Sequence, residues 1–277
     1  MKKKALWISI IGILLIGFVC LFCYRHYIRQ KQIEQKKHTG LVSEDFPVED
    51  IKHEIKNIYE DAYQTEADTQ LQNMRNNNSY TIEDPLLVWN PYGTNTGSFY
   101  YYGVSEQDSY AVCEVTCDKG SVIKHRLKND SNSGVTKTHE YLITGLAPGL
   151  ENHFSLAFYD AGNNLIDTYE YTVTLKKDKQ IPTITKVEKG NSKSSLTDGL
   201  FAVLGHDKSK AKNIYYYDNN GICRGKTPLN DYRTDRILTI DGKLVYSYSL
   251  TDIAFVNRLG KVEKTLSLGK YELHHDF

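Results

Sequence analysis

The residues best suited to chemistry in this chain are the adjacent histidines of the run His274-His275-Asp276, which lies just before Phe277. A neutral imidazole can attack an electrophile, carry the attached group and then leave, and it can exchange protons near neutral pH. The other interpretation of the run is a solvated tail, because residues this close to the end of a sequence are usually exposed.

Other polar candidates are scattered along the chain. Four histidines show neither metal-ligand spacing nor a partner carboxylate pattern, and we expect them to be ordinary strand or surface residues. They are His125, His139, His153 and His206. Arginines in hairpins are usually solvated, so no role is assigned to Arg224, Arg233 or Arg236. The sequence has no phosphate-binding glycine loop and no nucleophile elbow, and we assign no cofactor and no metal site.

The cysteines do not indicate a disulfide framework. Cys113 and Cys117 fall in one predicted strand, where four residues separate their Cα atoms by roughly 13 Å, too far for a bond. Cys20 and Cys23 lie in an apolar run, which leaves Cys223 as an odd thiol. We expect Cys113, Cys117 and Cys223 to be small buried apolar residues.

The composition favours a mainly β protein. The 277 residues hold 34 Lys plus Arg against 34 Asp plus Glu, so the net charge is zero and argues against a general nucleic-acid binder. Tyr supplies 21 residues, mostly in short alternating runs, and Tyr favours half-buried strand surface.

The N-terminus predicts a membrane anchor. Three lysines precede about twenty apolar residues ending at Tyr24, enough to cross roughly 30 Å of hydrocarbon, and no small-residue cleavage site follows. Residues 1–24 are therefore expected to form a transmembrane helix rather than a cleaved signal. Basic residues between Arg25 and Lys37 outnumber the leading lysines, and this charge pattern alone would place the following body in the cytoplasm.

Residues 25–79 are expected to form a stalk and then an amphipathic helix. The helical pattern opens at Pro47 and ends at Asn76-Asn77-Asn78. Its apolar positions recur at helical spacing: Ile51, Ile55, Ile58, Tyr59, Ala62 and Tyr63. We expect this helix to pack on its own domain rather than to dimerise.

Residues 80–176 predict an immunoglobulin-like β-sandwich. About seven short alternating segments separated by turn signals are typical of that fold. The predicted strands are Leu86 to Asn90, Ser98 to Val104, Tyr110 to Thr116, Ser121 to Leu127, His139 to Thr144, His153 to Tyr159 and Leu165 to Leu175.

Residues 183–277 predict the first blade of an incomplete β-propeller. Tight turns join short strands, and four antiparallel strands make one blade, whereas a propeller takes about four to eight blades. The predicted strands are Asn213 to Asp218, Arg236 to Ile240, Lys243 to Ser249, Asp252 to Asn257 and Lys261 to Leu268. The fold class expected is thus mainly β, with two N-terminal helices, a sandwich and a truncated propeller.

Four segments resemble the bacterial aryl-sulfate sulfotransferases that use no nucleotide donor. The run Tyr80-Thr81-Ile82-Glu83-Asp84-Pro85-Leu86-Leu87-Val88-Trp89-Asn90-Pro91-Tyr92-Gly93 resembles the start of their N-terminal domain. The turn Gly145-Leu146-Ala147-Pro148-Gly149-Leu150-Glu151-Asn152 resembles one late in that domain. Asp218-Asn219-Asn220-Gly221 with Arg224 resembles their first propeller hairpin, although Gly225 stands where they usually have an aromatic residue. Leu259-Gly260-Lys261-Val262 with His274-His275-Asp276 resembles the approach to their active site.

The resemblance covers about residues 45–277 and implies sulfuryl transfer from a phenolic sulfate ester to a phenol through a histidine intermediate. It makes His275, and next His274, the expected catalytic residues, while the histidine that is sulfated in the family lies further downstream and has no counterpart here. The implied partners are a phenolic sulfate donor, a phenol acceptor, the membrane, and a second chain or further copies that complete the propeller. Nucleic acid is not expected as a partner. Family members act outside the cytoplasm, so an extracytoplasmic body on a single-pass membrane anchor is preferred over the charge pattern.

An alternative function is a membrane-anchored, non-catalytic immunoglobulin-like binding module. Its tyrosine runs, Tyr100 to Tyr102 and Tyr215 to Tyr217, would then offer aromatic contact surface, whereas alternate tyrosines in a strand more often serve in packing.

Overall fold

The structure is a computed structural model whose described residues are mainly β, with one long helix. It describes residue 24 and residues 48–131, 134–181, 188, 199–204, 212–231, 234 and 236–273. Within these residues no helix is long and apolar enough to cross a membrane. The predicted anchor at residues 1–24 lies outside the described residues except for Tyr24, and most of the stalk lies outside them too.

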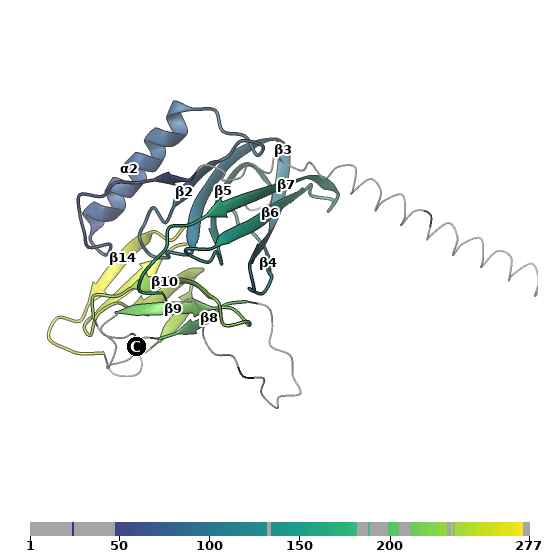
Figure 1. The fold of residues 1–277 in the computed structure, drawn as a ribbon. Helices are drawn as coiled ribbons and strands as arrows, with labels where there is room; N and C mark the ends of the chain where they lie inside the picture. Colours follow the sequence, from purple (N-terminus) through teal and green to yellow (C-terminus); the bar gives the residue numbers. More distant parts are fainter. Residues whose placement is uncertain are drawn as a thin grey trace, which may run out of the picture.

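The N-terminal half forms one seven-stranded sheet that curls on itself (Figure 1). Its strands are β1 (Glu49–Asp50), β2 (Leu86–Trp89), β3 (Ser98–Cys117), β4 (Ile123–Arg126), β5 (Thr136–Thr144), β6 (Glu151–Tyr159) and β7 (Leu165–Thr174). The first half of β3 pairs with β2 and β5, and its second half pairs with β4 and β6. Because β3 belongs to both halves, the inner faces of the two halves enclose one apolar core.

Alternating side chains build this core. Buried members from the first half include Phe99, Tyr101 and Ile143, and those from the second half include Phe154 and Phe158. The rings of Phe99 and Phe154 lie 4.9 Å apart between their centroids, so side chains from the two halves touch. Period-two burial along β6 and β3 explains why these strands could be predicted from sequence.

The predicted strands of this half are all present, but two of them are one. Ser98 to Val104 and Tyr110 to Thr116 were expected as separate strands, and that separation is wrong because β3 runs through both over 20 residues. The polar residues 105–109 between the two predicted strands remain in β3, and they form an irregular step in its pairing with β5 between Val104 and Ser109. The immunoglobulin-like arrangement of two separate sheets is not confirmed; the observed unit is a single curled sheet.

His139 occupies the inside of this bend. Its imidazole is fully buried, with Nε2 3.0 Å from the hydroxyls of both Ser105 and Ser109 and Nδ1 2.9 Å from the Tyr141 hydroxyl. Desolvation lowers the pKa of His139 to about 4. His139 is a strand residue, as predicted, but it is not an ordinary one. Its neutral, buried ring connects β5 with the two serines that flank the bend.

The helix starts later than the sequence pattern indicates. Helix α2 spans Asp61–Asn77, so its predicted end at Asn76-Asn77-Asn78 is confirmed, but residues 48–60 are not helical and the predicted start at Pro47 is wrong. Glu49 and Asp50 instead pair in parallel with β2. Three isoleucines in this region are β-branched, which lowers helix propensity, and Ile51 and Ile58 pack against two different clusters.

The C-terminal half forms two further antiparallel sheets, green and yellow in Figure 1. The three-stranded sheet contains β8 (Phe201–Val203), β9 (Asn213–Tyr217) and β10 (Cys223–Pro228). The four-stranded sheet is a meander of β11 (Ile237–Ile240), β12 (Lys243–Ser247), β13 (Asp252–Val256) and β14 (Val262–Ser267). All five predicted strands are confirmed, β8 and β10 were missed, and the meander has the strand order of a single propeller blade.

The buried histidine predicts a pH-dependent stability. Because the pKa of His139 is lowered in the folded chain, the unfolded chain, with a histidine pKa near 6.5, binds a proton between about pH 6.5 and 4 that the folded chain does not bind. The stabilisation is complete above about pH 6.5, falls by roughly 3 kcal/mol as the pH drops to about 4, and then levels off. Urea unfolding at several pH values should show that His139→Gln flattens this slope. Replacing the exposed His153 by Gln keeps His139 and should keep its slope; a slope unchanged in His139→Gln contradicts this account.

Candidate functional site

The two histidines singled out by the sequence, His274 and His275, lie outside the described residues, as does the following Asp276. The last described residue, Leu273, is 9% exposed and packs with Val245 and Ile253 on one face of the four-stranded sheet. Its amide donates to the carbonyl of Leu250 at 2.7 Å. The chain is therefore anchored on the blade-like sheet at the residue immediately before His274.

Between the curled sheet and the three-stranded sheet lies a buried ion pair. Arg224 and Asp218 both have side chains with 0% exposure, and Arg224 Nε donates to Asp218 Oδ2 at 2.8 Å. The other guanidinium nitrogens reach the curled sheet, donating to the carbonyls of Gly145 at 2.8 Å and Ser121 at 2.6 Å. Asp218 Oδ2 also accepts from the Ser121 amide at 2.9 Å.

The expectation that Arg224 is solvated is wrong. Each nitrogen of its guanidinium donates one hydrogen bond to a protein acceptor, and the side chain is fully buried, so it is not accessible to a sulfate group. Of the other two arginines, Arg236 is exposed and Arg233 lies outside the described residues. The sequence carried a signal for Asp218 alone, which closes the hairpin turn by accepting the amides of Asn220 and Ile222.

Two glycines let the backbones meet beside this pair. A Cβ on Gly97 would lie 1.7 Å from the Arg224 carbonyl oxygen, and one on Gly225 would lie 2.6 Å from the Gly97 nitrogen. Gly225 also has φ +130, a conformation that other residues rarely adopt. The departure at Gly225 from the aromatic residue usual in the family is thus explained, because a side chain there would collide with the curled sheet.

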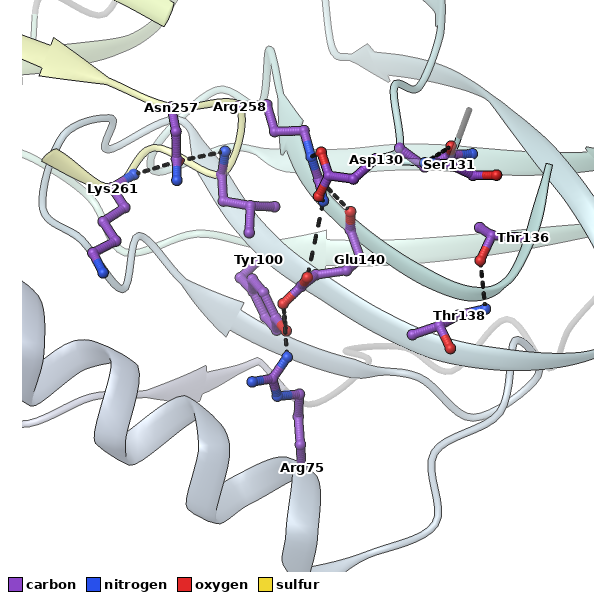
Figure 2. Close-up of polar contacts among 12 residues, drawn as sticks. Arg75, Tyr100, Asp130, Ser131, Thr136, Thr138, Glu140, Asn257, Arg258 and Lys261 are labelled. Atoms are coloured by element: carbon purple, nitrogen blue, oxygen red, sulfur yellow. Dashed lines mark hydrogen bonds and ion pairs between the residues drawn. The ribbon is translucent and has the colours of Figure 1, made fainter. Parts of the chain in front are cut away.

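The hairpin turn between β13 and β14 is fixed by a second set of charges (Figure 2). Arg258 binds Asp130 and donates to the Glu140 carbonyl at 2.6 Å. The Glu140 carboxylate in turn accepts from Arg75 of α2 at 2.8 Å and from the Tyr100 hydroxyl at 2.6 Å. These contacts join the turn, the helix and the curled sheet around Glu140.

Lys261, at the start of the same approach segment, is also paired. Its ammonium group binds Asp68 of α2, which accepts from the Tyr92 hydroxyl at 2.7 Å. The arginine and lysine of this segment therefore already have carboxylate partners. They position β14, the strand that leads toward His274, rather than offering free cations for an anionic substrate.

The remaining candidates behave as buried or surface residues. Cys113, Cys117 and Cys223 are free and buried, as predicted, and burial raises the pKa of each thiol. His153 lies at the surface near Glu151 and Thr172. His206 lies outside the described residues. Among the described residues, no three His, Cys, Asp or Glu side chains converge as a metal site would require.

Three cavities contain no Lys or Arg that could hold a sulfate ester. One of about 550 Å³ is lined by Glu83, Glu106 and Asp167, and one of about 380 Å³ by Glu114 and Glu170. The third, about 310 Å³, has no charged residue among the described residues of its lining. An anion in these cavities would meet no described lysine or arginine to pair with, although His153 also lines the second cavity.

The C-terminal third of the chain matches a model of a known protein family. Residues 185–277 match the family model for arylsulfotransferases (ASST), and this range contains β8 to β14, Asp218, Arg224 and both C-terminal histidines. The predicted resemblance is confirmed for this segment. We refer to residues 185–277 as the arylsulfotransferase segment.

The match begins after two of the four motifs that suggested the family. Tyr80 to Gly93 and Gly145 to Asn152 precede the arylsulfotransferase segment, so the wider resemblance from residue 45 stays a prediction. A search of curated proteins found no match. The structure nevertheless connects the second motif with the segment, since Gly145 accepts a hydrogen bond from Arg224.

The buried pair predicts a large loss on removal of either partner. Arg224→Met leaves Asp218 charged and buried, which should lower the free energy of unfolding by about 3–5 kcal/mol. The double variant Arg224→Met with Asp218→Asn should lose less than the sum of the two single variants, because they share one interaction. Urea unfolding measures all three.

The matched control is the exposed pair of Lys124 and Glu114, whose nitrogen and oxygen lie 2.9 Å apart. Lys124→Met should cost less than about 1 kcal/mol. Equal losses in Arg224→Met and Lys124→Met would show that Arg224 does not hold the sheets together.

Proposed function

We propose that this chain takes part in sulfuryl transfer from a phenolic sulfate ester to a phenol, as an aryl-sulfate sulfotransferase. The observation that supports it is the match of residues 185–277, which includes His274 and His275. The contacts of Arg258 and Lys261 with the curled sheet and α2 hold the start of β14, the strand that leads to these histidines, and so support a fixed approach to them.

In the proposed reaction the S–O bond to the donor phenol breaks as an N–S bond to an imidazole forms. The acceptor phenol then loses its proton to the group that protonated the departing phenolate, its oxygen attacks sulfur, and the N–S bond breaks to restore the imidazole. The sulfuryl oxygens carry negative charge throughout, so fixed N–H donors around them lower the barrier. His275 is proposed to supply such a donor, with His274 as the second choice, and a protonated imidazole can also return a proton to the departing phenolate.

The proposal includes additional protein that completes the site. The described residues build a four-stranded sheet and a three-stranded sheet, whereas a closed propeller takes about four to eight blades. The free cations that the transferring group needs are missing from the three cavities described above. We therefore propose that a second polypeptide with further blades, including the carrier histidine, joins this chain.

The test is transfer from a chromogenic phenyl sulfate to phenol, measured for the full chain with and without the product of the adjacent reading frame. We expect no turnover by the chain alone and turnover with the partner, reduced about 10²-fold or more in His275→Ala. His153→Gln, a surface change, should keep full activity. Turnover by the chain alone would still support sulfuryl transfer but replace the second polypeptide by self-association. No turnover either with or without the partner would overturn the proposal in favour of the non-catalytic binding module.

For the location we propose a single-pass membrane anchor at residues 1–24 with the body outside the cytoplasm. Alkaline phosphatase fused to the C-terminus is active only when exported, so the fusion should be active. If the alkaline phosphatase fusion is inactive and a reporter that works only in the cytoplasm is active at the same position, the body lies in the cytoplasm, as the charge pattern alone predicts.

A further inference from the structure

A cavity of about 310 Å³ lies where the curled sheet meets both C-terminal sheets. Its walls come from the turn at Thr94, from β5, β8, β9 and β12, and from the turn before β14. The lining includes Leu142, Thr144, Ala202, Tyr216, Thr227 and Leu244. None of the described lining side chains is charged, and most of the lining is aliphatic or aromatic.

Most polar groups of the lining are already used within the protein. The Thr94 hydroxyl donates to the Gly260 carbonyl at 2.6 Å, and the Thr227 hydroxyl donates to the Thr94 carbonyl at 2.5 Å. The Thr227 oxygen then accepts from the Tyr216 hydroxyl at 2.7 Å. These hydroxyl groups therefore have few hydrogen bonds left for a ligand, and the remaining surface of the cavity is mainly apolar.

Two donors remain. In the part of the chain that the structure describes, the Thr144 hydroxyl and the side-chain nitrogen of Asn95 have no hydrogen-bond partner, whereas Asn95 Oδ1 accepts from the Gly97 amide at 3.0 Å. A ligand that fills the apolar space can therefore gain one or two hydrogen bonds if it presents an acceptor. A ligand without one would leave these donors unpaired.

We propose that this cavity binds an uncharged aromatic molecule of up to two rings that carries one hydrogen-bond acceptor. An apolar cavity of roughly 150 Å³ already holds one benzene ring, so about twice that volume suits two rings. A sulfate ester is disfavoured, because the described residues of the lining include no cation to pair with its charge. The site is separate from the histidines of the proposed reaction and does not depend on that proposal.

Occupancy of this site would stabilise the junction of the sheets. The ligand would touch β5 of the curled sheet, β8 and β9 of the three-stranded sheet and β12 of the meander at once. Binding to the folded protein alone raises its stability by mass action. The cavity thereby offers a way for a small molecule to strengthen the contact between the curled sheet and the arylsulfotransferase segment.

Benzophenone is the probe for the test, because it is uncharged, has two rings and one carbonyl acceptor, and couples to nearby C–H groups under light. After irradiation of the full chain, mass spectrometry of peptides should find saturable adducts on the strands that carry Leu142, Ala202 and Leu244. Naphthalene should compete for this labelling, whereas a sulfonated benzophenone should label these strands at least tenfold less.

Two variants on one strand provide the matched comparison. Ala202 and Val203 are neighbours in β8 and both are exposed, but Ala202 lines the cavity and Val203 does not. Ala202→Phe should reduce the labelling at least tenfold, and Val203→Phe should leave it within twofold. Thr144→Val should weaken benzophenone labelling about fivefold without changing competition by naphthalene, the ratio expected for one hydrogen bond.

The proposal is overturned if adducts are spread over the surface, if the sulfonated probe labels equally well, or if Ala202→Phe folds and is labelled like the unaltered chain. Circular dichroism checks the folding. If Ala202→Phe does not fold, Thr144→Val decides, and equal labelling in that variant contradicts the proposed contact. None of these readouts uses sulfuryl transfer, so failure here and failure of the proposed reaction are distinguishable.

Discussion

The arrangement of the sheets depends on one fully buried ion pair, Arg224 with Asp218. The two partners have different structural roles. Asp218 closes the hairpin between β9 and β10, and Arg224 donates to the carbonyls of Ser121 and Gly145 in the curled sheet. A buried charge pair contributes little net stability compared with apolar packing of the same volume, but breaking it is costly. The pair therefore acts chiefly by selecting one relative position of the two sheets, since any displacement would leave a buried charge without its partners.

Close backbone contact between the curled sheet and β10 requires glycine at two positions. The Gly97 and Gly225 backbones approach so closely that neither tolerates a side chain. Outside this contact, Thr96 and Lys226 exchange hydrogen bonds through the Lys226 carbonyl and the Thr96 hydroxyl at 3.0 Å each. A turn of the curled sheet thus continues the hydrogen bonding of β10, and the arylsulfotransferase segment is joined to the N-terminal half by backbone as well as by charge.

The sequence alone predicted elements whose residues alternate along a strand and failed where tertiary contacts decide. Strands β6, β7 and β12 to β14 show period-two burial or tight glycine turns, so their ranges were predicted closely. Strand β10 was missed because Cys223-Arg224-Gly225-Lys226 has no such alternation, and each of these residues is buried by a contact with another part of the chain. The start of α2 was misplaced because isoleucines at helical spacing instead reach two separate clusters in extended chain. The role of Arg224 required its partners, which lie 79 and 103 residues away.

The distribution of positive charge limits where sulfuryl chemistry can occur. Arg75, Arg224, Arg258 and Lys261 are bound to carboxylates or carbonyls, and Lys226 is 6% exposed and paired with Asp178. These cations hold the helix, the turn and the sheets together, and moving one toward a sulfate group would expose a carboxylate or carbonyl that it now satisfies. A sulfate ester that bound one of these five cations would break a contact that the cation now makes. The proposed function therefore relies on the histidines that follow Leu273 rather than on these cations, because an imidazole can also donate N–H groups to a sulfate oxygen.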